Sequence, residues 1–121
     1  MKLLRLSSSK VIQQVSDGSL NEDDIRQAFL MRALDVAVES NFLAEVCHKI
    51  DKIPKRNSDL DSSNTLKGLF FSVSDWIEMN SFDSTCGLVS RSLKPMTEDA
   101  VIVKVLRDHL QATPLFRSSV N

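Results

Sequence analysis

Residues 20–53 read LNEDDIRQAFLMRALDVAVESNFLAEVCHKIDKI and form the longest apolar stretch of the chain. When residues 21–39 are wound as a helix at about 100° per residue, apolar side chains cover most of the circumference. A helix that is apolar nearly all round is typical of the buried centre of a fold. We therefore expect residues 21–39 to form a central helix. Asn21 is its expected cap, and three acidic residues follow at the positive end of the helix dipole.

One narrow polar stripe interrupts this apolar surface. It consists of Asp24, Arg32, Asp35 and Glu39, whose spacings place them above one another on a helix. We predict Arg32, Asp35 and Glu39 as interface residues.

Residues 41–53 are also helical by pattern, but their apolar face is turned by roughly half a turn relative to residues 21–39. Two arrangements fit this change of phase. A break at Ser40 or Asn41, with either residue capping a new helix, suits a compact monomer. One straight helix through this point suits a dimer whose protomers exchange helices. We favour the break.

Length and composition indicate one helical domain over residues 1–121. The 121 residues are 42% hydrophobic and 26% charged, as in ordinary globular domains. Three glycines, three prolines and no tyrosine argue against a β fold with many turns. Further helices are expected near residues 7–17, 65–80, 83–93 and 97–111, with a polar loop at residues 54–64. The predicted fold is all-α, a small bundle of five or six helices with one long polar loop.

The sequence predicts a cytoplasmic protein with no membrane partner. The first ten residues lack the apolar segment of a signal peptide, and no apolar run approaches the roughly 18 residues of a membrane span. The first acidic residue is Asp17, which leaves a mitochondrial presequence as an alternative. Two cysteines, Cys47 and Cys86, are too few for a disulfide framework and fit a reducing compartment.

Residues able to carry chemistry are few. His109 falls on the apolar face of the expected last helix, where a core histidine is the ordinary interpretation. Cys86 is a candidate nucleophile near the start of a predicted helix. The sequence has no Gly-x-Ser-x-Gly elbow, no glycine-rich phosphate loop and no zinc-ligand spacing. We expect a protein that is not an enzyme and that holds no cofactor or metal.

A basic cluster follows the central stretch. Lys49, Lys52, Lys55 and Arg56 have a simple structural explanation, because cations near a helix C-terminus complement its dipole. No aromatic side chains alternate with these residues, as a single-strand binder would require. The net charge of −1 also lacks the positive field of most nucleic-acid-binding proteins. A nucleic-acid-binding regulator that uses this cluster is the first alternative function.

Phe71 breaks the pattern of residues 65–80, since it falls on the polar side of that predicted helix beside Lys67 and Glu78. An aromatic side chain in such a place is a candidate contact residue. Together with the apolar surplus of residues 21–39, it favours a non-enzymatic protein-protein interaction module, an adaptor, inhibitor or regulator. We expect its partner to be another protein or itself, most simply in a two-fold homodimer. A small-ligand binder or enzyme with a pocket near His109 and Cys86 is the third possibility.

Overall fold

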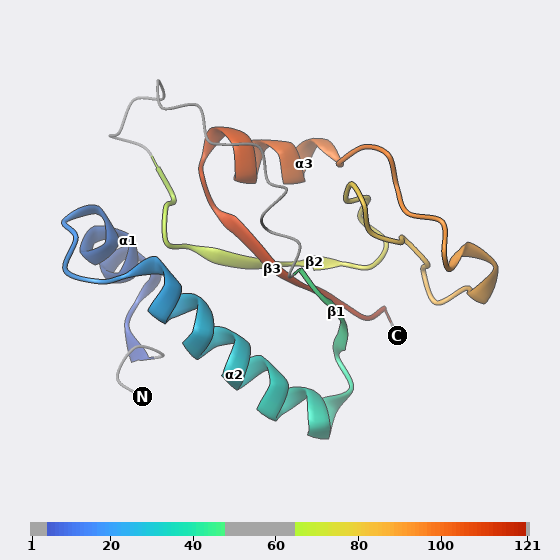
Figure 1. The fold of residues 1–121 in the computed structure, drawn as a ribbon, viewed down its shortest axis with the longest axis horizontal. Helices are drawn as coiled ribbons and strands as arrows, with labels where there is room; N and C mark the ends of the chain where they lie inside the picture. The colour runs from blue at the N-terminus through green and yellow to red at the C-terminus, as the bar shows by residue number, and fades with distance from the viewer. Residues whose placement is uncertain (1–4, 48–64, 121) are drawn as a thin grey trace.

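The computed structural model describes residues 5–47 and 65–120 (Figure 1). It places a three-stranded sheet between helices, so the prediction of an all-α bundle of five or six helices is wrong. The elements in chain order are α1 (Ser8–Ser16), α2 (Glu22–Ser40), β1 (Leu43–Val46), β2 (Phe70–Ser74), the 3-10 turn η4 (Val89–Arg91), α3 (Val101–Lys104), the π-helical turn η5 (Val105–His109) and β3 (Thr113–Ser118).

The last strand of the chain is the middle strand of the sheet. The strand order is β1-β3-β2, in which β3 is antiparallel to β1 and parallel to β2. The register with β2 shifts after Pro114, so Leu115 is an extra residue on β3. Proline cannot donate a ladder hydrogen bond and is tolerated in a sheet at such an irregularity. This bulge explains how a central strand contains Pro114.

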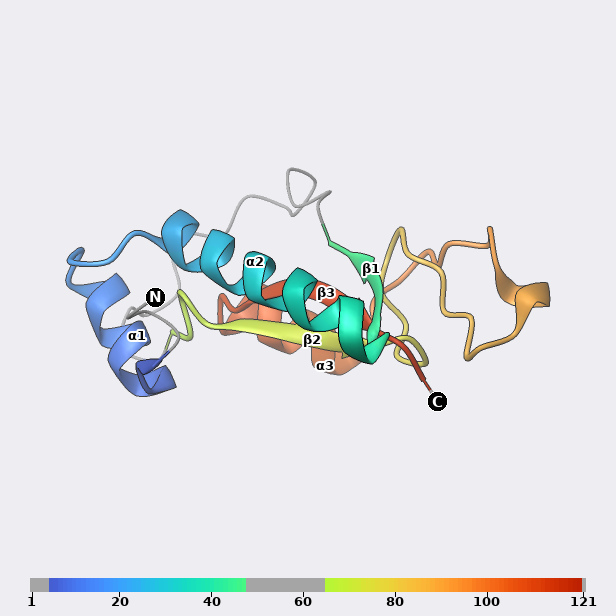
Figure 2. The ribbon, with the colours of Figure 1, turned by 90° about the horizontal axis from the view of Figure 1, so that it is seen from below.

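Helices cover the two faces of the sheet, and Figures 1 and 2 show α2 on one side and α3 on the other. On the α2 side, the rings of Phe29 and Phe70 lie 6.2 Å apart. The opposite side holds a buried cluster made of Cys47, Val73, Met79, Phe82 and Val103. The core is therefore divided into two layers by the sheet, instead of surrounding one central helix.

The N-terminal boundaries of α2 agree with the sequence. The side chain of Asn21 accepts a hydrogen bond of 2.9 Å from the backbone N–H of Asp23, which confirms the predicted cap. The helix ends at Ser40, and Asn41 has a left-handed backbone with a φ of 50°. The predicted break is confirmed. The second helix predicted after it is wrong, because β1 begins two residues beyond Asn41.

The outer side of α2 is exposed, which corrects the prediction of a buried central helix. Only Ile25 and Ala33 are fully buried among the residues of α2. Met31, Leu34 and Val38 have relative exposures of 61%, 52% and 89%. The helix packs one stripe against the sheet, and no described element covers the opposite stripe.

Residues 65–80, predicted as a helix, contain β2 instead. Because β2 has protein on both faces, it contains the consecutive apolar residues Phe70 and Phe71, and such a run resembles part of a helix. Phe70 packs toward Phe29 of α2, whereas Phe71 packs against the buried cluster on the α3 side. The spacing that suggested a helix over residues 65–80 therefore comes from apolar residues on both faces of a strand.

The remaining helices are shorter than predicted. The expected helix over residues 83–93 is reduced to the three-residue turn η4. The predicted last helix is present as α3 followed by η5, but it begins at Val101, with Ala100 as its N-cap. The polar loop predicted at residues 54–64 lies outside the described residues. None of the described helices combines the length and the apolar character needed to cross a membrane.

Candidate functional site

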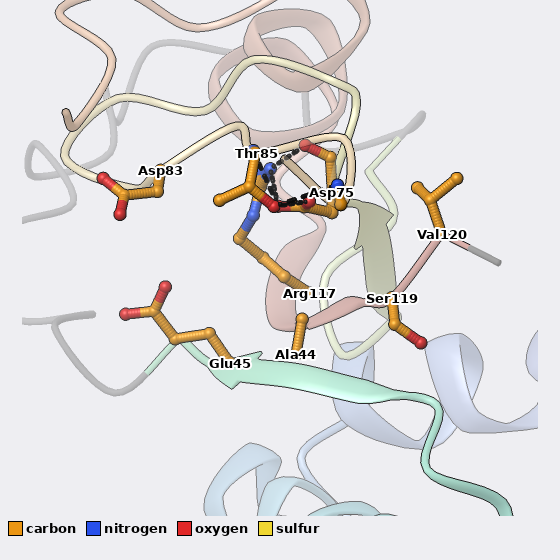
Figure 3. Close-up of a pocket in the computed structure, with 9 residues that line it drawn as sticks. Ala44, Glu45, Asp75, Asp83, Thr85, Arg117, Ser119 and Val120 are labelled. Carbon is orange, nitrogen blue, oxygen red and sulfur yellow. Dashed lines mark hydrogen bonds and ion pairs between the residues drawn. The ribbon is translucent and has the colours of Figure 1, made fainter. Parts of the chain in front are cut away.

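A polar pocket lies where the two parallel strands end. Ser74 of β2 is opposite Ser118 of β3, so both strands finish at the same edge of the sheet. Ligands in open α/β sheets commonly bind outside the carboxyl ends of the strands. The pocket has a volume of about 310 Å³ (Figure 3). Its lining residues are Ala44, Glu45, Asp75, Asp83, Thr85, Gly87, Arg117, Ser119 and Val120.

Arg117 is the most deeply buried charged residue at this pocket, with a relative exposure of 1%. Its guanidinium donates hydrogen bonds to the carbonyl oxygens of Asp75 at 2.8 Å and Ile77 at 3.1 Å. It also lies 3.5 Å from the carboxylate of Asp75. Arg117 therefore holds the turn after β2 in place by hydrogen bonds to two backbone carbonyls and by an ion pair with the Asp75 carboxylate.

Asp75 organises the loop on the other side of the pocket. Its carboxylate accepts hydrogen bonds from the backbone N–H of Thr85 at 3.3 Å and from the Thr85 hydroxyl. The Ser84 hydroxyl donates to the carbonyl oxygen of Asp75 at 2.7 Å. Burial alone would raise the pKa of Asp75, but the hydrogen bonds from Thr85 and the charge of Arg117 lower it overall. A carboxylate with a lowered pKa is a weak general base, so Asp75 is suited to holding structure.

The rim of the pocket is acidic. Figure 3 shows the carboxylates of Glu45, on β1, and Asp83 on the same side of Arg117, and all three residues line the pocket. The carboxylate of Asp83 accepts a hydrogen bond of 2.6 Å from the backbone N–H of Leu93. Because Asp75 offsets the charge of Arg117, the two rim carboxylates leave the pocket negative. Such a rim suits a ligand group that donates N–H or O–H hydrogen bonds.

The residues predicted to carry chemistry do not meet at this pocket. His109 is exposed at the end of η5, and Cys86 is half-buried with its sulfur 3.5 Å from the Arg91 guanidinium. Neither residue lines the pocket of Figure 3. In the two described segments, no group of three or more His, Cys, Asp or Glu side chains is placed to hold a metal ion.

The predicted interface residues fall into two environments. Arg32, Asp35 and Glu39 are all exposed on α2, in the same part of the helix as the exposed Leu34 and Val38.

Phe71 is different, because it is half-buried in β2 and packs against the buried cluster. A substitution there would change the core as well as any contact. The basic cluster Lys49, Lys52, Lys55 and Arg56 lies outside the described residues.

A second exposed apolar surface lies on α3, on the other side of the sheet. Val101 and Ile102 have relative exposures of 77% and 53%, and Val105 is also exposed. Val103, between them, is buried in the cluster beneath. Both helical layers therefore present apolar side chains away from the sheet.

The pocket residues were missed because the strands were missed. Asp75, Thr85 and Arg117 are far apart in sequence and match no short motif. One signal was available: Asp75 comes directly after the largely apolar segment Phe70–Ser74, and polar residues that follow such a strand gather at the edge of a parallel sheet.

The chain matches no family model. It is 25% identical over 118 residues to the "Vitamin D3 hydroxylase-associated protein" of Gallus gallus, an alignment that covers 98% of this chain and 25% of that protein. It is 29% identical over 114 residues to the "Putative amidase kk1C" of Curvularia clavata, which covers 88% of this chain and 21% of that protein. The chain thus spans about a quarter or less of the length of these two curated relatives.

Proposed function

We propose that this chain acts by binding protein, with self-association as its simplest form, and that it has no chemistry of its own. The observation that carries the proposal is the exposure of apolar side chains on both helical layers, represented by Val38 on α2 and Val101 on α3. Large exposed apolar surfaces in a small protein are typical of interaction sites.

The composition of the α2 surface supports this proposal. Met31, Leu34 and Val38 recur at spacings of one helical turn, and Arg32 and Asp35 lie between them. Burying three such side chains favours association, and the charges between them select the partner and its orientation. The cytoplasm remains the proposed location, which the free thiols of Cys47 and Cys86 support.

Sedimentation of the purified chain over a range of concentrations tests this proposal. The double variant Leu34→Glu/Val38→Glu should keep its far-ultraviolet circular dichroism, because both side chains are exposed, and should associate more weakly than the natural chain. Lys10→Glu on the exposed side of α1 is the matched control and should have no effect. A monomer at every concentration that also captures no protein partner would overturn the proposal.

Action on an amide bond is the second candidate function. It is favoured by the similarity to a protein named as an amidase and by a pocket at the carboxyl ends of β2 and β3. The carboxylates of Glu45 and Asp83 can accept hydrogen bonds from the N–H groups of an amide.

This candidate is tested by titrating simple primary amides, such as benzamide, against the isotope-labelled chain. Benzamide should shift the backbone N–H resonances of the chain around Thr85 and Gly87, and the absence of these shifts in the Glu45→Gln variant would support amide binding. An unchanged spectrum at saturating benzamide would remove it. A parallel assay for ammonia release separates binding from hydrolysis.

A further inference from the structure

Strand β2 is an open edge of the sheet. In the order β1-β3-β2 it has β3 on one side and no described strand on the other (Figure 2). The carbonyl of Leu69 accepts from the N–H of Thr113 at 3.0 Å, and the N–H of Asp75 donates to the carbonyl of Ser118 at 2.9 Å. Backbone groups alternate in direction along a strand. Those of Phe70, Ser72 and Ser74 therefore point away from β3.

This edge lacks the features that protect edge strands from pairing. The sequence of β2 is Phe-Phe-Ser-Val-Ser, without charge or proline, and the irregularity in its pairing lies on β3. Ser72, at its centre, is exposed. Strand β1, at the other edge, has four residues and an irregular register at Ala44. An uncharged, regular edge strand is a template for another strand.

We propose that β2 pairs with β2 of a second copy of this chain, in antiparallel orientation about a two-fold axis at Ser72. The proposal rests on the proposed function, because it adds the edge of the sheet to the apolar helix surfaces as a further surface for self-association. The two-fold axis places Ser72 opposite Ser72 and the large side chain of Phe70 opposite the small Ser74. The carbonyl of Ser74 already accepts a hydrogen bond of 2.9 Å from the N–H of Ile77, so the other outward backbone groups of these residues would form about four hydrogen bonds between the copies.

Charge favours the antiparallel orientation and a second copy as the occupant. Lys67 precedes β2 and Glu78 follows it, and both are exposed. In the two-fold arrangement, Lys67 of each copy lies toward the end of the strand where Glu78 of the other copy lies. A parallel arrangement would bring like charges together, which is unfavourable. The charges that flank β2 are thus complementary to those of a second, antiparallel copy of the same segment.

The sheet formed by two copies would be closer to common β-sheets in its number of strands than the three-stranded sheet of one copy. Three strands from each copy give one continuous sheet in the order β1-β3-β2-β2-β3-β1. Sheets commonly have about four to six strands, and parallel strands are usually covered on both faces. Helices α2 and α3 lie on the two faces of the sheet (Figure 2), and the helices of the second copy would continue these two layers.

Cross-linking at the axis is the direct test. Residues in a hydrogen-bonded antiparallel pair have Cα atoms about 5.5 Å apart, within the range of a disulfide. Ser72→Cys in a Cys86→Ser background should therefore form a covalent dimer under mild copper-phenanthroline oxidation. Ser40→Cys in the same background, exposed at the far end of α2, is the matched control and should remain mostly monomeric on a denaturing gel.

A second variant keeps the test independent of thiol chemistry. Ser72→Lys places two positive charges opposite each other at the axis and should raise the dimer dissociation constant by about fivefold. Ser40→Lys should leave it unchanged. If the chain dimerises but Ser72→Cys does not cross-link and Ser72→Lys has no effect, the β2 pairing is overturned. If that dimer is weakened by Leu34→Glu/Val38→Glu, the proposed function nevertheless stands. A chain that is monomeric throughout overturns the β2 pairing, and it overturns the proposed function as well if it captures no protein partner.

Discussion

Arg117 in β3 donates a hydrogen bond of 2.8 Å to the carbonyl oxygen of Asp75, 42 residues earlier, and so joins the ends of two parallel strands. The same guanidinium faces the carboxylate of Asp75, which in turn holds Thr85. One buried cation thus connects β3, the turn after β2 and the loop beyond it. The pocket at this edge depends on that connection.

Removing Arg117 should destabilise the fold strongly. Arg117→Met leaves the carboxylate of Asp75 without its cation and the carbonyl of Ile77 without its donor, while the carbonyl of Asp75 keeps only the Ser84 hydroxyl; breaking such a buried pair typically costs about 3–5 kcal/mol. Urea denaturation followed by circular dichroism measures the loss. Arg91→Met, at an exposed position, should change stability by less than about 0.5 kcal/mol. A loss below about 1 kcal/mol for Arg117→Met would contradict this account.

Stability should fall in acid partly because of Asp75. The folded-state pKa of Asp75 is lowered, so its contribution is present above the unfolded-state pKa of about 3.9 and is lost as the pH falls through the lower folded value. Asp75→Asn should reduce the slope of unfolding free energy against pH below about pH 4. Asp35→Asn, an exposed change on α2, serves as the comparison. Equal slopes in the natural chain and Asp75→Asn would argue against the role of Asp75.

The two cysteines should differ in reactivity. Burial raises the pKa of the Cys47 thiol to about 12, and the side chain has a relative exposure of 2%. Because the thiolate is the reactive form, Cys47 should not react with a disulfide reagent at pH 8 in the native protein. We expect one fast thiol, from the half-buried Cys86, and a second only on unfolding. Rapid reaction of the Cys86→Ser variant would show that Cys47 is accessible.

Gly68 should tolerate substitution poorly, for two separable reasons. Its φ is +86°, and an added Cβ would lie 2.6 Å from a methyl carbon of Val15 in α1. Gly18 has a φ of +77° but open space around it. Gly18→Ala should therefore cost about 1–2 kcal/mol of backbone strain, and Gly68→Ala more. Val15→Ala added to Gly68→Ala should recover part of the difference in thermal unfolding. Equal costs for the two glycines would exclude the steric contribution.

Local signals in the sequence predicted the two ends of α2 well. The Asn21 cap and the end of α2 depend on residues within one helical turn, so the sequence shows them directly. The burial of α2 was predicted wrongly, because the sequence pattern shows which residues are apolar but not whether other elements cover them. Val38 is apolar and nevertheless 89% exposed.

The strands could not be predicted because their partners are distant. β2 pairs with β3 across about forty positions, and each strand has at most six residues. Phe70 and Phe71 face opposite sides of the sheet, and this gives a run that also fits a helix. Proline is disfavoured in a central strand, and Pro114 is tolerated in β3 because of the bulge beside it, which the sequence alone does not show. The pocket depends on the same pairing, so Asp75 and Arg117 could not be connected from the sequence.

The middle position of β3 has a consequence for the synthesis of the chain. A ribosome produces β1 and β2 well before Thr113–Ser118, so neither early strand has its ladder partner while the intervening residues are translated. In the nascent chain, the β2 segment with Phe70 and Phe71 then has no strand paired to either of its edges. Loss of Thr113–Ser118 alone would leave β1 and β2 without the strand that joins them, and the described sheet could not form.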